Sequence, residues 1–281
     1  MKRIASIQDV SCLGRCSQTV ALPVVSAMGV ECAILPTAVL STHTSFPDFI
    51  CHDLTDQLLP VARHWKTQGV RFDALYTGYL ASDRQVAVVL ELLELLADQD
   101  TLLFVDPAMA DHGKLYAGFG PEFPALMARV VSRAQITVPN ITEASLMTGM
   151  AYRETYDEDY IKALLHGVAA LGAEKVVLTG VSFEKDTIGF MSYDSVTGAY
   201  DSYFNRREPQ AYHGTGDIFS ATAVGGIMRG LSLREAFRLA VDFTLQCIQA
   251  TRTDPQAAWY GVEFEKALPL LTARIRESAD G

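Results

Sequence analysis

The sequence has few of the features that mark secreted scaffolds, membrane proteins and nucleic-acid binders. Its 281 residues include only 5 cysteines, an odd number spread over the chain, which argues against a disulfide framework and predicts buried free thiols. The longest apolar stretch, residues 86–97, contains two glutamates and is too short to cross a bilayer. Lys and Arg number 23 against 33 Asp and Glu, and the net charge of -10 argues against a surface built for nucleic acid or anionic lipid.

These absences favour an acidic, soluble enzyme in a reducing cytoplasm. Polar residues at Ser6, Gln8 and Asp9 interrupt what would otherwise be the apolar core of an export signal. Several catalytic signatures are also missing: there is no Gly-x-x-x-x-Gly-Lys-Ser/Thr phosphate loop, no His-Glu-x-x-His motif and no Gly-x-Ser-x-Gly elbow. Walker-type ATPases, the common metalloproteases and serine hydrolases are therefore disfavoured.

Short apolar runs alternate with longer amphipathic ones up to about residue 180, which is typical of an α/β fold with a mostly parallel sheet between helices. No linker or repeat interrupts the pattern, so we expect a single domain over residues 1–281. The predicted parallel strands are Arg3–Ile7, Glu31–Leu35, Ala74–Thr77, Leu102–Val105, Gln135–Val138 and Lys175–Leu178.

Other local patterns complete this outline. Capping-box spacings predict helix starts after Ser82 and after Ser232, because Gln85 and Glu235 follow three residues later. Residues 187–193 and 199–205 flank a turn sequence and predict an antiparallel hairpin. Residues 37–53 are crowded with polar side chains, which favours a loop or a small lid over a cleft.

The sharpest chemical signal is the segment Gly214-Thr215-Gly216-Asp217, which precedes a run of small and apolar residues suited to a packed helix. Glycines at a helix start let backbone N–H groups converge on an anion, and the helix dipole adds to the attraction, so phosphate is the expected ligand. Asp217 would repel that phosphate unless its carboxylate accepts the proton of a substrate hydroxyl. The simpler alternative is that Asp217 only caps the helix.

Polar side chains also follow several predicted strands. Asp106 and Asp111 come after one strand and Asn140 and Glu143 after the next, and the carboxyl ends of parallel strands face a common crevice. Oxygen ligands of this kind suit hydrated Mg²⁺ with nucleotide phosphates, although turn chemistry and a helix start would also explain them.

Further strand-end residues are Thr179, Tyr79 and Asp9, and the polar stretch contains His43 and Thr44. Tyr79 offers an aromatic face to a ring, but packing explains a tyrosine there equally well. For His43, Thr44 and Asp9, a solvated loop or an ordinary turn is the alternative to a binding role.

Taken in order, these segments resemble the pyridoxal/pyridoxamine (vitamin B6) kinases of the ribokinase-like superfamily over essentially the whole chain. The resemblance rests on six places at once, namely Ile7-Gln8-Asp9 with Gly14, Leu40-Ser41-Thr42-His43-Thr44, Thr77-Gly78-Tyr79-Leu80, Asp106-Pro107 through Asp111, Pro139-Asn140 with Glu143, and Gly214-Thr215-Gly216-Asp217.

The resemblance implies a three-layer α/β fold with a strand-and-loop lid at residues 37–53, and ATP-dependent phosphorylation of the 5′-hydroxymethyl group of pyridoxal, pyridoxine or pyridoxamine. Asp217 would be the general base, and the amides of Gly214, Thr215 and Gly216 the anion hole. The other implied roles are nucleotide binding by Asp111, Asn140, Thr179, Gly214 and Gly216, binding of Mg²⁺ or a monovalent cation (K⁺ or Na⁺) by Asp106, Asp111 and Glu143, and contact with the pyridine ring by His43, Thr44 and Tyr79.

The resemblance also implies a cytoplasmic homodimer that salvages vitamin B6. Better-known pyridoxal kinases carry serine at the place of Asp9, so we expect Asp9 to pair with a protonated pyridine nitrogen or an amine. The alternatives are a hydroxymethylpyrimidine, sugar or nucleoside kinase of the same superfamily, or a non-catalytic nucleotide or vitamin sensor.

Overall fold

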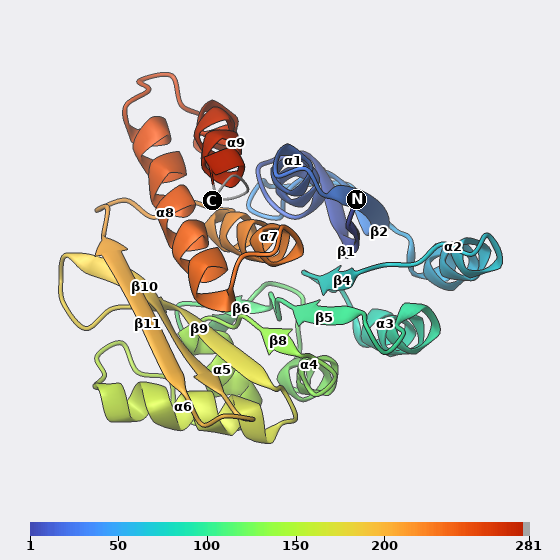
Figure 1. Cartoon of the computed structure of the whole chain (residues 1–281), viewed down its shortest axis with the longest axis horizontal. Coiled ribbons are helices and arrows are strands. Elements are labelled where there is room, and N and C mark those ends of the chain that lie inside the picture. Colours follow the sequence, from blue (N-terminus) through green and yellow to red (C-terminus); the bar gives the residue numbers. More distant parts are fainter. Residues whose placement is uncertain (278–281) are drawn as a thin grey trace.

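The structure is a computed structural model in which residues 1–277 are described. One mixed sheet runs through it, in the order β11-β10-β9-β8-β5-β4-β1-β2-β3 (Figure 1). Its strands are β1 (Arg3–Leu13), β2 (Glu31–Thr42), β3 (Cys51–Asp53), β4 (Ala74–Thr77), β5 (Leu102–Val105), β8 (Ile136–Thr137), β9 (Lys175–Val181), β10 (Thr187–Asp194) and β11 (Tyr200–Arg206). The strands from β9 to β2 are parallel, whereas β3, β10 and β11 at the two edges are antiparallel.

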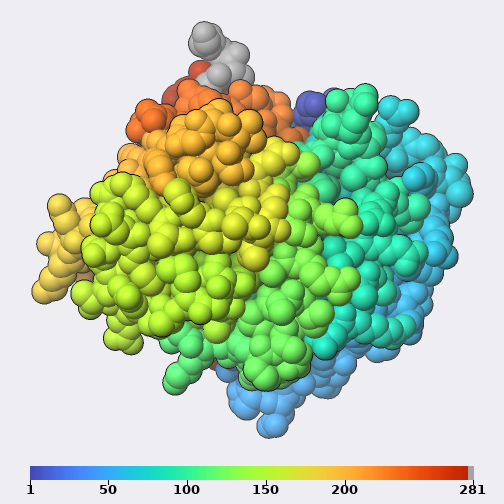
Figure 2. Space-filling model, turned by 90° about the horizontal axis from the view of Figure 1, so that it is seen from below, coloured from blue at the N-terminus to red at the C-terminus, as the bar shows by residue number. Residues whose placement is uncertain are grey.

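Helices cover both faces of the sheet, which is the predicted three-layer arrangement (Figure 1). One layer contains α2 (Thr55–Thr67), α3 (Asp83–Leu96), α4 (Phe123–Val131), α5 (Ile141–Thr148) and α6 (Glu158–Ala170). The other contains α1 (Gln18–Ala27), α7 (Thr215–Met228), α8 (Leu233–Arg252), the short 3₁₀ turn η1 (Phe264–Lys266) and α9 (Leu268–Glu277). Figure 2 shows the first layer from outside, where the chain passes from blue and cyan α2 and α3 to yellow-green α6.

Each layer buries its own apolar core against one face of the sheet. Leu75 and Val105 point toward α2–α6, whereas their neighbours Tyr76 and Phe104 point toward α1 and α7, as alternation along a strand requires. α7 is apolar or small on nearly all sides, because it is sandwiched between α1, α8 and the sheet. This burial fixes the glycine-rich start of α7 relative to the strands.

The local starts of the helices follow the predicted chemistry, with one difference. Ser232 and Glu235 form the complete capping box of α8. Ser82 caps α3 through the amide of Gln85, but the Gln85 side chain accepts from Ala81 N (2.7 Å) and donates to Thr37 O (3.0 Å). Gln85 therefore ties α3 to β2 instead of closing a capping box.

The first two strands are longer than predicted. β1 continues past Ile7 to Leu13 with a register shift between Gln8 and Val10, and β2 continues to Thr42. The 37–53 segment is therefore strand, loop and strand, since Leu40 pairs with Cys51 of β3. The extensions were not predicted, because polar residues occupy alternate positions in these parts of β1 and β2 and interrupt the apolar runs that indicate a buried strand.

The cysteine prediction was only partly right. All five are free, but Cys247 alone is buried, and Cys12 and Cys51 are exposed on the extended ends of β1 and β3. Within residues 1–277, no helix is both long enough and apolar enough to cross a membrane. The small hairpin of β6 (Ala110–Asp111) and β7 (Lys114–Leu115) lies beside the main sheet.

Candidate active site

The carboxyl edge of the parallel strands brings the predicted site residues of the nucleotide half together. Asp106 follows β5, Asn140 follows β8 and pairs with Thr179 of β9, and the first turn of α7 lies above them. This is where ligands bind in open α/β sheets, since loops and helix N-termini converge there.

The glycine turn before α7 is shaped as an anion site. Gly214 is the N-cap in the left-handed conformation (φ 81°), and a Cβ there would overlap the carbonyl oxygen of Arg15. No side chain caps α7, so its first amides are not satisfied by a capping group. A Cβ at Gly216 would meet open space, and Gly216 is exposed, so an anion can approach these amides closely.

Asp217 lies in the first turn of α7 and is partly buried. Desolvation, reinforced by the charges of Asp106 and Asp9, raises its pKa to about 8. Backbone hydrogen bonds from Ser17 and from its own amide act in the opposite direction. Capping alone does not account for Asp217, because Gly214 holds the N-cap position; a carboxyl group with a pKa near neutrality suits proton transfer.

Asp106 is buried directly beneath α7. Its Oδ2 accepts a hydrogen bond of 2.6 Å from the Ser220 hydroxyl, one turn along α7 from Asp217. Desolvation raises the pKa of Asp106 to about 6, and the Ser220 hydrogen bond opposes the shift. The fully buried Tyr76 lies next to this pair, near Ser220 and Gln8.

Asn140 and Glu143 form a capping box at the start of α5. Asn140 Oδ1 accepts from Glu143 N (2.9 Å), and Glu143 Oε2 accepts from Asn140 N (2.9 Å). The Asn140 side-chain amide donates to Ala110 O (2.8 Å), and Glu143 Oε1 accepts from Met109 N (3.1 Å). Asn140 and Glu143 therefore cap α5 and at the same time hold the Asp106–Asp111 loop in place at the candidate site.

Glu143 and Asp106 form an acidic pair. Desolvation and then the charge of Asp106 raise the pKa of Glu143 well above its usual value. Within residues 1–277, no three His, Cys, Asp or Glu side chains converge to hold a metal ion by themselves. Two carboxylates still fit Mg²⁺ or a monovalent cation whose remaining ligands are phosphate oxygens and water, the usual way Mg²⁺ binds in phosphoryl-transfer enzymes.

The two remaining nucleotide-side candidates lie on the same edge. Asp111 is exposed on the β6–β7 hairpin, and its charge acts on His213 just before the glycine turn. Thr179 is partly buried, and its amide and hydroxyl contact Pro139 O at 3.0 and 3.4 Å.

On the substrate side, Asp9 lies at the register shift of β1 and is 4% exposed. It accepts from the Ser11 hydroxyl (3.0 Å), and desolvation raises its pKa. Register shifts of this kind re-aim side chains next to sites. Tyr79 packs against Phe119 (5.5 Å between ring centroids), and burial together with the Asp9 charge raises its pKa to about 12.

His43 is buried, in contrast to the solvated loop histidine considered from sequence. Its Nδ1 accepts from Ser45 N (3.2 Å), and its ring meets His213 and Trp259 edge-on at 4.6 and 5.9 Å. Desolvation and the neighbouring His213 lower its pKa, so His43 is neutral at pH 7. Thr44 beside it is exposed.

Sequence reasoning missed residues that reach the site from distant segments. Ser45 Oγ lies 2.9 Å from His213 Nε2, which joins the loop after β2 to the glycine turn. Trp259, 65% exposed, packs against Phe46 with the rings tilted and their centroids 4.5 Å apart. None of these residues has a motif of its own, although the position of His213 directly before the glycine turn is a signal that could have identified it.

Two cavities in the described part of the chain lie away from this site. A cavity of about 540 Å³ is lined by residues 66–71 and 95–100, and another of about 240 Å³ lies between α8 and α9. Neither includes a residue of the strand edge or the glycine turn. The chemistry of the side chains, not cavity size, locates the candidate site.

Comparison with known proteins agrees with this geometry. The phosphomethylpyrimidine kinase family matches residues 22–259. The pyridoxal kinase of Arabidopsis thaliana is 27% identical over 268 residues, covering 92% of this chain and 85% of that protein. The crystal structure of pyridoxal kinase from Lactobacillus plantarum superposes with a TM-score of 0.89 at 32% identity and 99% coverage of both chains.

A protein from Bacteroides thetaiotaomicron, provisionally described as a phosphomethylpyrimidine kinase and crystallised with pyridoxal, superposes with a TM-score of 0.91 at 35% identity, covering 96% of this chain and 95% of that one. The predicted resemblance and the ribokinase-like fold are thereby confirmed. The chain belongs to the phosphomethylpyrimidine kinase family, in which its relatives include vitamin B6 kinases.

Proposed function

We propose that this enzyme transfers the γ-phosphoryl group of ATP to the 5′-hydroxymethyl group of pyridoxal, pyridoxine or pyridoxamine. The observation that carries the proposal is the position of Asp217 beside a glycine turn with uncapped amides, at the edge where Asp106 lies close enough to Asp217 and to Glu143 for their charges to interact. The relatives that phosphorylate or bind B6 vitamers support the choice of substrate.

Asp217 is assigned as the general base. Its carboxylate accepts the proton of the substrate hydroxyl while that oxygen bonds to the γ-phosphorus, and the bond from the γ-phosphorus to the β–γ bridging oxygen breaks, leaving ADP. The amides of residues 214–216 stabilise the negative charge on the transferring group. Positioning and charge neutralisation supply most of the rate, because phosphoryl transfer needs little covalent help from the protein.

Asp106, Asp111 and Glu143 are assigned to cation binding, and Asn140 and Thr179 to the phosphate side of the edge. Mg²⁺, when bound with the nucleotide, neutralises phosphate charge. Asn140 acts through its hold on Glu143 and on the Ala110 carbonyl, because both ends of its amide are engaged in these contacts. Burial of Asp106 and Glu143 favours a bound cation, since their ionised forms are otherwise poorly solvated.

Asp9, His43, Thr44 and Tyr79 are assigned to the pyridine ring. A buried carboxylate at the Asp9 position favours a substrate with a cationic nitrogen, and neutral His43, whose Nδ1 accepts from Ser45 N, can donate a hydrogen bond through Nε2. The exposed Trp259 ring near His43 offers a surface on which a planar ring stacks. A homodimeric, cytoplasmic enzyme activated by K⁺ or Na⁺ remains the expectation.

One assay distinguishes the candidates. Purified enzyme with Mg·ATP is offered pyridoxal, pyridoxine, pyridoxamine, hydroxymethylpyrimidine, ribose and adenosine separately, and ADP release is recorded together with the mass of the product. We expect turnover with the B6 vitamers at a kcat/KM at least tenfold above that with the other compounds. A higher kcat/KM for hydroxymethylpyrimidine, a sugar or a nucleoside would replace the proposed substrate, and tight binding without turnover of any compound would indicate a sensor.

A further inference from the structure

The turn between β1 and α1, residues 14–17, holds an unusual backbone. Ser17 has φ 50° and ψ −132°, a region that residues with a side chain rarely adopt, and it is 6% exposed. α1 begins directly after it, and the Ser17 carbonyl accepts from Val20 N (3.0 Å) and Ala21 N (2.8 Å). A conformation of this kind persists only when the surroundings enforce it.

This turn contacts both halves of the candidate site. The Ser17 hydroxyl is close enough to Asp9, and the Ser17 backbone N–H close enough to Asp217, to oppose the rise in the pKa of each carboxyl group. The carbonyl of Arg15 lies against Gly214 so closely that no Cβ would fit there. The same short segment therefore sets where the substrate-side acid, the base and the anion hole lie relative to one another.

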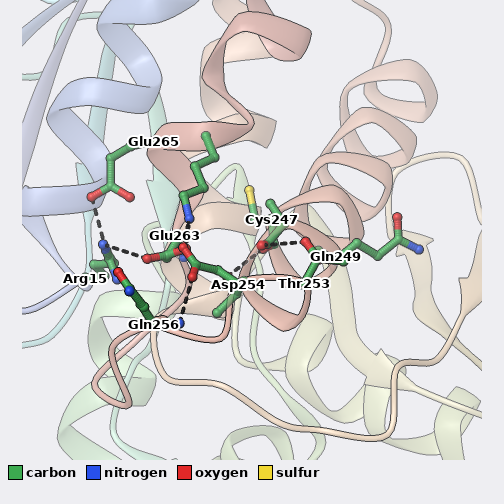
Figure 3. Close-up of polar contacts among 11 residues, drawn as sticks. Arg15, Cys247, Gln249, Thr253, Asp254, Gln256, Glu263 and Glu265 are labelled. Carbon is green, nitrogen blue, oxygen red and sulfur yellow. Dashed lines mark hydrogen bonds and ion pairs between the residues drawn. The ribbon is translucent and has the colours of Figure 1, made fainter.

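Arg15 fastens the turn to the C-terminal segment, as Figure 3 shows. Its Nε donates to Glu265 (3.1 Å), and its terminal nitrogen lies 3.8 Å from Glu263 Oε1. The Arg15 side chain is 17% exposed and the Glu263 side chain 11%, so water screens the attraction between their charges only weakly. Lys266 balances the charge of Glu263 from the other side.

The C-terminal segment is itself fixed. Glu263 N donates to the Thr251 hydroxyl of α8 (2.7 Å), and a Cβ at Gly261 would come within 2.7 Å of the Arg15 Cβ. The Arg15 guanidinium lies 5.6 Å from the centre of the Tyr260 ring. The turn is thus held between the segment of residues 260–265 and the glycine turn before α7.

We propose that Ser17 and Arg15 are positioning residues for phosphoryl transfer: the strained turn, anchored through Arg15 to Glu263 and Glu265, holds Asp217 and the Gly214 turn in register with Asp9. The inference rests on the proposed function for the identity of the groups it positions. The strained backbone at Ser17 supports this role, because a turn that only connected β1 to α1 could relax to a common conformation or carry glycine at residue 17.

The test uses the full chain with Ser17→Gly and Arg15→Gln. Glycine adopts the observed φ without steric cost, so Ser17→Gly should have a melting temperature no lower than the natural enzyme. At the same time the turn gains freedom, and we expect kcat at saturating pyridoxal and Mg·ATP to fall at least tenfold with the KM for ATP within threefold. Undiminished stability together with a decreased kcat is a combination that substitution of a merely structural residue does not give.

Arg15→Gln should lower kcat by a similar factor. Its matched control is Arg63→Gln, which removes a 3.0 Å ion pair to Glu91 between side chains more than half exposed and should leave kcat unchanged. Amide hydrogen exchange supplies a readout independent of turnover. In Ser17→Gly and Arg15→Gln, the amides of residues 214–217 should exchange at least tenfold faster, while those of β4 and β5 stay unchanged.

Two results would overturn the inference: a kcat for Ser17→Gly within twofold of the natural enzyme, or unchanged exchange at residues 214–217. Faster exchange throughout the sheet in both variants would also count against it, since that is general destabilisation. If the natural enzyme phosphorylates no B6 vitamer, the proposed function fails, and the exchange comparison still decides whether the turn holds α7 in place.

Discussion

Replacing Asp217 by asparagine should separate the chemistry of the site from its stability. Asparagine keeps the shape of the side chain but cannot accept the hydroxyl proton, and loss of a general base typically costs 10²- to 10⁴-fold in rate. We therefore expect kcat to fall by about two to four orders of magnitude. Binding of Mg·ATP should remain within about threefold, because its amides and cation ligands stay in place.

The same substitution should make the folded protein more stable at neutral pH. The pKa of Asp217 rises from 3.8 to about 8 on folding. Between about pH 4 and pH 8 this carboxyl group is therefore ionised in the unfolded chain but still protonated in the folded protein. The natural protein loses stability as pH increases through this range, because the unfolded state is favoured by its ionisation. One pKa unit is worth about 1.4 kcal/mol, but water reaches the partly buried side chain. We expect a gain of about 1–3 kcal/mol at pH 8 and about none at pH 3.

The measurements are ADP release for kcat and urea unfolding at pH 3, 6 and 8 for stability. In the natural enzyme, log kcat/KM should rise with pH up to about 8, because the free enzyme must lose the Asp217 proton to act as a base. Asp217→Asn should lack this limb. The reasoning is refuted if the variant turns over within tenfold of the natural rate, or if it is less stable at pH 8 than the natural enzyme.

The remaining predictions concern the anion turn and substrate choice. Gly214→Ala should lower the free energy of unfolding by at least about 1–3 kcal/mol and abolish turnover, because φ is 81° and the new methyl group would overlap Arg15; urea unfolding and ADP release measure both. Asp9→Ser should lower kcat/KM for pyridoxamine relative to pyridoxine by about tenfold, since a buried carboxylate no longer pairs with the amine; an unchanged ranking of the vitamers would remove Asp9 from specificity.

The parallel sheet was predictable because its strands are short apolar runs that end in polar breaks. Ala74–Thr77 and Leu102–Val105 have the predicted bounds, since buried strands leave no choice of register. Strands near the edge follow a weaker pattern: β2 exposes Val39 and Ser41 and buries Leu40 between them, so its second half resembles a polar loop in the sequence. Only pairing with the extension of β1 makes it a strand.

For the candidate site as well, residues in local motifs could be predicted from the sequence, whereas residues placed by long-range packing could not. Asp217 and Gly214 were found because a glycine turn and a helix start are local signals, and Asn140 with Glu143 because a capping box spans three residues. Sequence reasoning did not identify Ser17, because its proposed role depends on an unusual backbone angle that the neighbouring residues do not predict. Its contacts with Asp9 and Asp217 exist only once α7 has packed beside α1.

An acidic protein can still bind a nucleotide phosphate at this site, because the carboxylates there are buried and poorly solvated. Within residues 1–277, the hydrogen bonds to Asp106, Glu143 and Asp217 come from backbone amides and a serine hydroxyl, not from lysine or arginine. Burial therefore leaves these carboxylates with raised pKa values and without a fixed counter-charge. A polyanionic nucleotide is attracted to such an edge only together with cations, so binding of the phosphate and binding of the cation must reinforce each other. Fixed positive side chains would have bound free phosphate as readily, whereas this arrangement makes the cation-bound nucleotide the form that the site prefers.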